Sequence, residues 1–420
     1  MTASPHSAER PVRAAHGLGV RASGLRRHNL STLLERLHLS GSASRSELSA
    51  ATGLNRSTIS DLVQQLVALG LVVEDGVATS TGPGRPSPIV HVRPGGAVAV
   101  AVELNVDSLA VATIGLGGQV FDQVRTELPR GESAPDDTVQ KVASLAGPLI
   151  DSLPEHHTLA GVGVATAGVT RRSDGVVHFS PNLGWKDIPV GAMLAEAMGE
   201  PAGRVMVANE ADVGALGEQR RGAGFGIDNL VFVSGEVGIG AGLIIGGRPM
   251  LGAAGYAGEA GHMLVNPDGQ LCQCGARGCW ETEAGETALL RAAQSPEASG
   301  LAAVDTVVGR LSGGDQVARD AVAQVGHWLG VGIGNLVNLL NPDLVVLGGM
   351  FQRLHSYVRD PMLVAMHERS LEPASSMVSV VPSGLGTSAQ LYGAAEMCLA
   401  KIITDPGGPR DQDGMVLERR

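Results

Sequence analysis

The spacing of apolar residues near the N-terminus predicts three short helices. Leucines at positions 30, 33, 34 and 37 repeat at i, i+3, i+4 and i+7, as on one face of an amphipathic helix that starts near Arg26. The residues Ser-Arg-Ser-Glu at 44–47 form a capping box, so a second helix begins there. Apolar residues between 59 and 69 predict a third helix, which Gly70 terminates.

A β-hairpin is expected after the third helix. Residues 71–74 have strand character, Asp75-Gly76 is a favoured hairpin turn, and the second strand would start at Val77. Three helices followed by a hairpin are typical of a winged helix-turn-helix domain. We expect this domain over residues 21–94, behind a flexible arm of residues 1–20.

A domain of this type places the N-terminal end of its third helix in the major groove of DNA. Short polar side chains and arginines at that position suit base edges and phosphates, and an arginine in a proline-stiffened strip suits the minor groove. The residues expected to contact DNA are Ser44, Arg45, Asn55, Arg56, Ser57, Thr58, Ser60 and Arg85. The alternatives are a small helical domain with a polar surface and, for Arg85, a rigid linker.

Beyond Pro94 the pattern changes to runs of small and β-branched residues. Runs at 97–102 and 109–114, followed by Gly117-Gly118, predict a β-meander. A helical stretch at 138–153 and a buried strand at 159–166 come next. A similar order of strands and helices recurs, with strands at 230–233, 241–245 and 344–347. Two such halves indicate an α/β fold of two lobes with a cleft between them.

Composition and charge narrow the class of protein. Aromatic residues make up only 3% of the 420 residues, which argues against single-stranded nucleic-acid binding by stacking. The net charge is −11, yet residues 1–94 carry ten arginines and six acidic residues, so a basic head precedes an acidic body. This asymmetry favours a polyanion as a partner at one end. We find no apolar run of membrane-spanning length and no signal segment, and we expect a cytoplasmic protein without membrane contact.

Three of the four cysteines lie within eight residues. Together with His262, the residues Cys272, Cys274 and Cys279 offer three thiolates and one imidazole, the closed donor set of a structural Zn²⁺ site. A catalytic zinc is disfavoured because four protein ligands leave no position for water. The alternative is a chance cluster of reduced thiols. We expect one structural zinc ion per chain.

Several motifs together are similar to the signature of the ROK family of repressors and sugar kinases. The most specific motif is Gly-Glu-Ala-Gly-His at 258–262, combined with the cysteine cluster and Gly-Cys-Trp-Glu at 278–281. Less specific parts of the resemblance lie at 182–185, 209–212, 238–242 and 341–349. The resemblance covers residues 26 to about 400 and is to the repressor branch, that of the xylose and N-acetylglucosamine repressors.

The resemblance implies an actin-like fold of two lobes, with sugar and nucleotide in the cleft. The family domain would then span residues 95–400, with a flexible tail at 401–420. Its first lobe would contain residues 95–207 and a C-terminal helix at 386–400, and its second lobe residues 208–385.

The resemblance also implies a set of sugar-binding residues. These are Asn209, Glu210, Glu259, His262 and Glu281. The chemistry suits this assignment because carboxylates accept hydroxyl hydrogens, and an imidazole fixed on a metal has a defined tautomer and direction. The alternative for Glu259 and Glu281 is that they are ordinary solvated acids.

The chain departs from the kinases of this family at three positions. Residues 103–107 are Glu-Leu-Asn-Val-Asp and lack the glycine that lets a backbone approach phosphate. Glu210 stands where the kinases have a catalytic Asp, and Glu236 places a negative charge in the second phosphate loop. We therefore expect a protein that is not an enzyme, and that keeps a sugar site without ATP binding or phosphoryl transfer.

These inferences converge on a sugar-responsive transcriptional regulator. We expect a repressor of carbohydrate-utilisation genes that leaves its double-stranded operator DNA when a small-molecule sugar binds. A homodimer or homotetramer would present two heads to a palindromic operator. Three alternatives stay open: an active sugar kinase with a DNA-binding head, a regulator controlled by a protein partner, and an activator.

Overall fold

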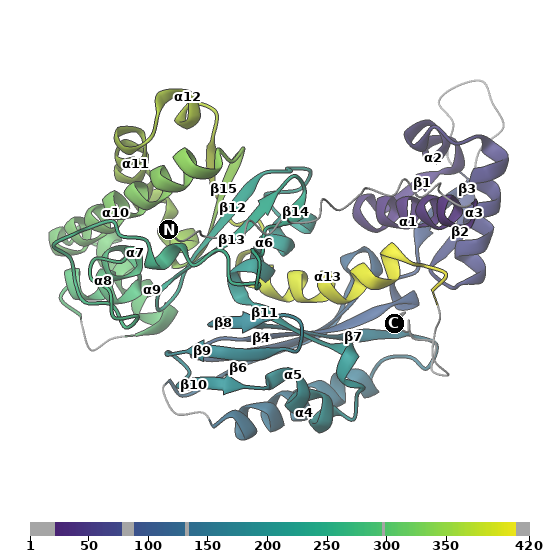
Figure 1. Ribbon diagram of the computed structural model, residues 1–420, viewed down its shortest axis with the longest axis horizontal. Helices are drawn as coiled ribbons and strands as arrows, with labels where there is room; N and C mark the ends of the chain where they lie inside the picture. The colour runs from purple at the N-terminus through teal and green to yellow at the C-terminus, as the bar shows by residue number, and fades with distance from the viewer. Residues whose placement is uncertain (1–21, 78–87, 131–133, 296–298, 409–420) are drawn as a thin grey trace, which may run out of the picture.

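The computed structural model describes residues 22–77, 88–130, 134–295 and 299–408. Over these residues the chain forms an N-terminal head and two lobes, with the head at one end of the molecule (Figure 1). The arm predicted at residues 1–20, Arg85 and the last twelve residues lie outside the described residues.

The head contains three helices and a small antiparallel sheet. Its elements are α1 (Ala22–Ser40), β1 (Ser42–Ser44), α2 (Arg45–Thr52), α3 (Arg56–Ala68), β2 (Val72–Val77) and β3 (Pro88–Val92), with strand order β1-β3-β2. The three predicted helices are therefore present. The capping box is also present: the Ser44 side chain accepts from the Glu47 amide, and the Glu47 carboxylate accepts from the Ser44 amide at 2.7 Å.

The hairpin turn predicted at Asp75-Gly76 is wrong. Strand β2 continues through both residues to Val77 and pairs with β3, with a register shift between Asp75 and Val77. The shift has a physical reason, because a β-bulge accommodates one extra residue in a strand without reversing the chain, and glycine is suited to that position.

The first lobe is built on a five-stranded sheet of order β11-β7-β4-β5-β6. The strands are β4 (Val98–Leu104), β5 (Ser108–Gly115), β6 (Val120–Glu127), β7 (Leu159–Thr166) and β11 (Val205–Asn209). The predicted meander corresponds to β4, β5 and β6, which are antiparallel neighbours, whereas β7 runs parallel to β4. Helices α4 (Pro135–Asp151) and α5 (Val190–Met198) pack below this sheet, beside a smaller sheet of β8 (Val169–Arg171), β9 (Val176–Ser180) and β10 (Trp185–Ile188).

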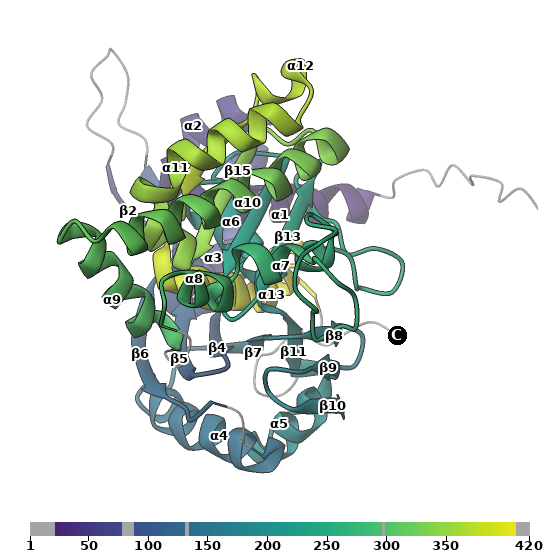
Figure 2. The same ribbon diagram turned by 90° about the vertical axis from the view of Figure 1, so that its left-hand side faces the viewer.

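The second lobe has a matching sheet of order β14-β13-β12-β15-β16. The strands are β12 (Leu230–Gly235), β13 (Ile239–Ile245), β14 (Arg248–Pro249), β15 (Leu344–Gly349) and β16 (Ser379–Pro382). The helices that complete the lobe are α7 (Trp280–Ala284), α8 (Glu286–Ala292), α9 (Gly300–Ser312), α10 (Gln316–Leu340), α11 (Met350–Arg369) and α12 (Glu372–Ser375). Figure 2 shows this lobe above the first, with α10 and α11 side by side. Short 3-10 turns join elements of the described chain at Pro94–Gly96, Leu116–Gly118, Ala202–Arg204, η4 (Ala260–His262) and Gly386–Ser388.

Two helices lie where the lobes meet. Helix α6 (Glu210–Arg221) packs on β12 and β13, while α13 (Ala389–Thr404) packs on β4 and β7, and the two helices pack on each other. The contact is so close that a Cβ added to Gly393 would lie 1.8 Å from the carbonyl oxygen of Val213. Glycine is therefore required where α13 crosses α6.

Helix α13 also connects the body to the head. It extends to Thr404, beyond residue 400 where we expected the family domain to end, because Ile402 and Ile403 are buried. One hydrophobic cluster contains leucines of α1 and α3 together with Leu391 and Leu399 of α13. The head is thus packed on the first lobe through a shared core.

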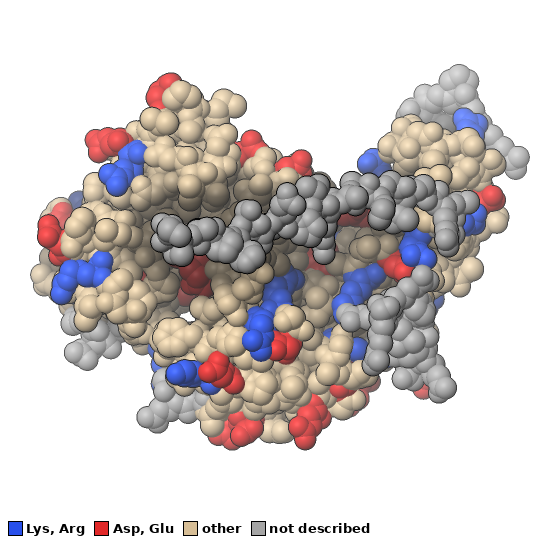
Figure 3. Space-filling view, in the orientation of Figure 1, with Lys and Arg blue, Asp and Glu red and all other residues tan. Residues whose placement is uncertain are grey.

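The fold class predicted from the sequence, a helix-turn-helix head followed by an actin-like pair of lobes, is confirmed. Within the described part of the chain, none of the helices has both the length and the apolar character required to cross a bilayer. On the face shown in Figure 3, basic and acidic side chains are intermixed, and acidic side chains are visible in the recess between the lobes.

Candidate functional site

A cavity of about 320 Å³ lies between the two lobes. Its wall on the first lobe includes Ser180 and Asn182, and its wall on the second lobe comes from the loops after β12 and around η4. All five residues that the sequence implied for sugar binding line this cavity: Asn209, Glu210, Glu259, His262 and Glu281. The structure therefore brings together side chains that are up to 72 residues apart in the sequence.

Asn209 has a structural role as well as a position in the cavity. It is the N-cap of α6, and its side-chain oxygen accepts from the amides of Ala211 and Asp212. Its Nδ2 donates to the carbonyl of Gly168 at 3.0 Å. One N–H of the amide remains for a ligand, so this residue can donate to a hydroxyl but has little capacity left to accept.

The carboxylates of the cavity lose part of their contact with water: Glu210 is half-buried, whereas the Glu259 side chain is still 42% exposed. Burial is the main cause that raises the pKa of Glu210 to about 7, and the charges of Glu103, Glu259 and Asp107 raise it further. Burial also raises the pKa of Glu259, although His262 acts in the opposite direction. Removal of carboxylates from water in this way is costly unless a ligand supplies hydrogen-bond donors.

Three buried side-chain atoms in the wall of the cavity have no hydrogen-bond partner among the residues that the structure describes. They are Oε2 of Glu210 and the hydroxyl oxygens of Ser180 and Ser234. Buried polar atoms are seldom unpaired. The cavity is therefore suited to a ligand rich in hydroxyl groups.

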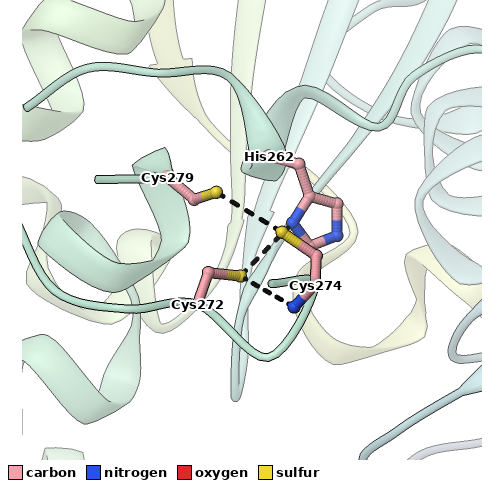
Figure 4. A group of neighbouring side chains, drawn as sticks. All are labelled: His262, Cys272, Cys274 and Cys279. Carbon is pink, nitrogen blue, oxygen red and sulfur yellow. Dashed lines mark hydrogen bonds between the residues drawn. The ribbon is translucent and has the colours of Figure 1, made fainter. Parts of the chain in front are cut away.

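The cysteine cluster lies directly beside this cavity. The side chains of His262, Cys272, Cys274 and Cys279 point toward one another (Figure 4), and their ligand atoms all lie within 4.8 Å of one another. The Sγ atoms of Cys274 and Cys279 are 3.6 Å apart. Thiolates that share a tetrahedral zinc at about 2.3 Å are separated by a little under 4 Å, so the four residues form a group that can hold such a metal ion.

The loop that carries the cluster is shaped by glycine. Gly278 has a φ of +72°, and a Cβ there would lie 1.6 Å from the carbonyl oxygen of Asn266. This close approach, with the bridges Leu264–Cys279 and Leu271–Arg277, folds the segment back on itself. The conformation of the backbone therefore brings the cysteines together without a bound ion.

The two ring nitrogens of His262 face different groups. Nδ1 lies 3.6 Å from Sγ of Cys272, whereas Nε2 lies 3.9 Å from a carboxylate oxygen of Glu259. The Cys272 thiol donates to Glu281 at 2.9 Å, and burial, followed by this hydrogen bond, raises the pKa of that thiol. Glu281 and His262 thus belong to both the cluster and the cavity wall.

A second, smaller cavity of about 50 Å³ is lined by the two segments in which the sequence departs from the kinase motifs, residues 103–107 and the segment around Glu236. Glu103 and Asp107 contribute to it from the first lobe, and Glu236 from the second. Burial, followed by the charge of Glu210, raises the pKa of Glu236 well above its ordinary value. Arg125 and Arg130 also line this cavity. Arg125 pairs with Glu103 at 2.7 Å, and Arg130 pairs with Asp107 and with Glu286 of α8, both at 2.9 Å.

Several residues predicted to contact DNA have structural roles in the head. Ser44 caps α2, and Asn55 caps α3 by accepting from the Thr58 amide at 2.9 Å. Arg45 is bound to the Glu74 carboxylate at 2.5 Å and also donates to Ser60 at 2.9 Å. These contacts fix the start of α3 in position, and they engage the side chains of Ser44, Asn55 and Arg45 within the head itself.

The exposed side chains at the start of α3 include Arg56 and Ser57. Gln64 is exposed as well, two turns after Ser57 on the same side of the helix, and sequence reasoning missed it although the helical period could have found it. Residues 22–77 and 88–94 carry six arginines and five acidic residues, so most of the basic excess of the head lies in residues outside the described part.

Sequence reasoning also missed residues of the cleft. Ser180 and Gln270 line the larger cavity but belong to no motif that carries chemistry, and Ser234 lies in the second phosphate-loop segment without having been assigned to the sugar site. Arg130 spans the lobes without any local signal in the sequence. Asn182 could have been found, because it opens the Asn-Leu-Gly-Trp motif.

Comparison with known proteins gives consistent matches along the chain. The ROK family profile matches residues 99–401, and the profile of the IclR helix-turn-helix domain matches residues 28–76. The xylose repressor of Bacillus subtilis is 31% identical over 377 residues, which cover 89% of this chain and 96% of that protein.

Solved structures with the same fold include a regulator and a kinase. A ROK family transcriptional regulator, a homologue of the E. coli MLC protein, superposes with a TM-score of 0.73 at 26% identity and covers 91% of this chain and 97% of its own. A ROK family glucokinase from Streptomyces griseus, in complex with glucose and AMPPNP, has a TM-score of 0.59 at 27% identity and covers 71% of this chain and 98% of its own.

The two solved structures differ in how much of the chain they match. The regulator covers nine-tenths of the chain, whereas the kinase covers about the share that the two lobes make up. The family predicted from the motifs is therefore confirmed, and so is the DNA-binding type of the head. The chain belongs to the ROK family, and the helix-turn-helix head in front of its ROK domain makes it a transcriptional regulator of that family.

Proposed function

We propose that this chain is a repressor whose affinity for operator DNA falls when a sugar binds in the cleft. The observation that carries the proposal is the cavity between the lobes, where Glu210, Glu259 and Glu281 meet beside unpaired hydroxyl groups. A monosaccharide presents several hydroxyl donors at once, and carboxylates are the acceptors that bind them most firmly. Relatives named as a xylose repressor and as a glucokinase with bound glucose make D-xylose and D-glucose the first candidates.

The proposal includes one structural Zn²⁺ held by His262, Cys272, Cys274 and Cys279. Zinc would fix the imidazole with Nδ1 toward the metal, which leaves Nε2, on the side of Glu259, for a sugar hydroxyl. The metal would also restrain the Glu281 segment, because Glu281 lies two residues after the ligand Cys279 and lines the cavity. Zinc chelation is therefore expected to weaken sugar binding as well as to destabilise the lobe.

We propose further that the chain does not transfer phosphate. A phosphate group in the smaller cavity would meet Glu236 on one side and Glu103 and Asp107 on the other. The arginines that could compensate are already paired: Arg125 with Glu103, and Arg130 with Asp107 and Glu286. The carboxyl groups of this cavity supply no positive charge to a nucleotide, and phosphoryl transfer depends on electrostatic stabilisation of the phosphates.

The functional unit would be a cytoplasmic homodimer or homotetramer. Two heads related by a twofold axis would place their α3 helices in successive major grooves of a palindromic operator. The exposed start of α3, with Arg56 and Ser57, supports this docking mode. Sedimentation of the full chain with and without operator duplex measures the number of chains per DNA.

Calorimetric titration of the zinc-loaded protein with D-xylose, D-glucose and N-acetylglucosamine tests the sugar site. Binding of one of them is expected, with a loss of about tenfold or more in Glu259→Gln, because one charged acceptor is removed. Glu155→Gln, which changes an exposed glutamate away from the cavity, is the matched control. The same sugar must weaken binding to an operator duplex in a fluorescence anisotropy assay at fixed salt.

Two results would overturn the proposal. The first is turnover of any of these sugars with ATP and Mg²⁺ in a coupled assay that Glu210→Ala abolishes, which would establish a kinase. The second is tight operator binding with no response to any sugar of the panel, which would favour control by a protein partner.

A further inference from the structure

We infer that the C-terminal end of α6 positions the DNA-binding head, through Arg221 with Glu396 and His38 and through Arg220 with Glu35. Helix α6 begins at the cavity with Glu210 and ends at these arginines. The inference rests on the proposed function only for the identity of the ligand, since the contacts themselves belong to the structure.

The two ends of α6 face two different sites. Twelve residues at 1.5 Å each give a helix about 18 Å long, so a single rigid element reaches from the cavity to the head. At the far end, Arg220 donates to Glu35 of α1 at 2.6 Å. Arg221 donates at 3.0 Å to the carbonyl of His38, which lies in the last turn of α1.

The contact around His38 is a buried network with defined directions. The amide of Gly117 donates to Nδ1 of His38 at 3.0 Å, and Nε2 lies 3.0 Å from both carboxylate oxygens of Glu396 and against the guanidinium of Arg221. Arg221 donates to the same carboxylate at 2.9 Å and to the carbonyl of Gly117 at 3.0 Å. Three segments of the body, α6, α13 and the turn between β5 and β6, therefore meet on one side chain of the head.

Burial makes this network sensitive to its geometry. The side chains of His38, Glu396 and Arg221 are 1%, 5% and 11% exposed. Burial acts to raise the pKa of Glu396, but its contacts with His38 and Arg221 outweigh burial and lower the pKa. A buried charge that loses its partner is strongly destabilising, so the network favours one position of the head over others.

Two other contacts between the described parts of the head and the body constrain the head less. The shared hydrophobic cluster is apolar, and apolar burial depends on area rather than on direction. The ion pair between Arg27 of α1 and Asp405 is 3.1 Å long, but its side chains are 42% and 25% exposed. An exposed pair of this kind contributes little to stability, and it supplies a matched control.

Helix α6 is also attached to both lobes. Near its start Asn209 donates to Gly168 of the first lobe, and near its end Glu218 accepts from the amides of Gly384 and Leu385 of the second lobe at 3.1 Å. A change in the angle between the lobes cannot leave both attachments and the contact with His38 unchanged. The head is thus linked to the cleft through a fixed set of polar bonds.

The test compares the full zinc-loaded chain with Glu396→Gln, Arg220→Gln and, as control, Arg27→Gln. Operator affinity is measured with and without D-xylose or D-glucose, and sugar affinity with and without operator duplex. Thermodynamic linkage requires that sugar changes operator affinity by the same factor as operator changes sugar affinity. We call this factor the coupling ratio, and couplings of this kind amount to about 5- to 150-fold. The ratios are expected to fall at least about fivefold in Glu396→Gln and Arg220→Gln but to be unchanged in Arg27→Gln, with sugar affinity of the DNA-free protein unaltered.

A second readout does not depend on sugar. Hydrogen exchange of the wild-type chain is expected to slow at the cavity end of α6 when the operator duplex binds, and this effect is expected to be absent in Arg220→Gln. Arg220→Gln changes an ion pair whose side chains are 30% and 43% exposed, so this variant is expected to fold. If no sugar binds the wild type, the proposed function fails, but the exchange measurement still decides the inference.

Two outcomes overturn the inference. One is a coupling ratio equal to that of the wild type in both Glu396→Gln and Arg220→Gln when both fold. The network would then stabilise the structure without linking the cavity to the head. The other is operator binding that leaves hydrogen exchange along α6 unchanged in the wild type.

Discussion

Asp212 provides a direct test of the electrostatics at the start of α6. Its side chain is only 7% exposed, and burial is the main cause that raises its pKa from 3.8 to about 7. Arg172 opposes this shift, whereas Glu259 adds to it. The perturbation is Asp212→Asn, which keeps the shape of the side chain and removes the carboxylate.

The magnitude follows from proton linkage. Between pH 5 and 7 the carboxyl of Asp212 is ionised in the unfolded chain but still holds its proton in the folded one, so the unfolded state binds fewer protons. Stability then falls with rising pH, by up to about 1.4 kcal/mol per pH unit, or about 3 kcal/mol over this window. The stability advantage of Asp212→Asn over the wild type is therefore expected to grow by up to that amount between pH 5 and pH 8.

Urea denaturation of both proteins at half-unit steps from pH 5 to 8 measures the difference. Other carboxyls also titrate in this range, but they cancel in the comparison of variant with wild type. Asp137→Asn, at an exposed site on α4, controls for the removal of one carboxylate elsewhere. A difference between Asp212→Asn and wild type that stays constant from pH 5 to 8 would refute the reasoning, because Asp212 would then be ionised throughout.

Three other predictions concern the metal, the head and the core. Cys279→Ser is expected to lower the zinc content and the melting temperature, as measured by metal analysis and thermal melts, because it removes one of four ligands. Glu74→Gln is expected to release Arg45 for contact with phosphate, which steepens the salt dependence of operator binding by about one ion. Gly393→Ala is expected to destabilise the protein by about 1–3 kcal/mol in denaturant titrations, since the added Cβ would lie 1.8 Å from a carbonyl oxygen of α6. Gly147→Ala, where nothing lies within 4 Å, is its control and is expected to stabilise by up to about 1 kcal/mol.

Much of the fold could be predicted because its signals are local. The strand at 159–166 corresponds to β7, and the capping box at Ser44 and Glu47 marks the start of α2. The four residues of the cysteine cluster were also found, because three of them share one short loop. Spacing along the chain determines each of these features.

Features that depend on the rest of the molecule could not be predicted in this way. Asp75-Gly76 is a turn signal taken alone, yet pairing of β2 with β3 turns it into a bulge. Arg45 resembles a DNA contact until the position of Glu74 is known, 29 residues further on. Arg130 and Glu286 are 156 residues apart, and only the closure of the lobes brings them together.

The sequence of α6 shows why a local reading can conceal such a role. Acids in its first turn, Glu210 and Asp212, and arginines in its last, Arg220 and Arg221, are the charges that the helix dipole favours at each end. The dipole alone would account for this pattern, and it would leave the arginines in water. Arg221 is instead 11% exposed and donates to α1, α13 and the turn between β5 and β6. The same charges that stabilise the helix therefore also join the cavity at one end to the DNA-binding head at the other, and only the long-range contacts distinguish the two roles.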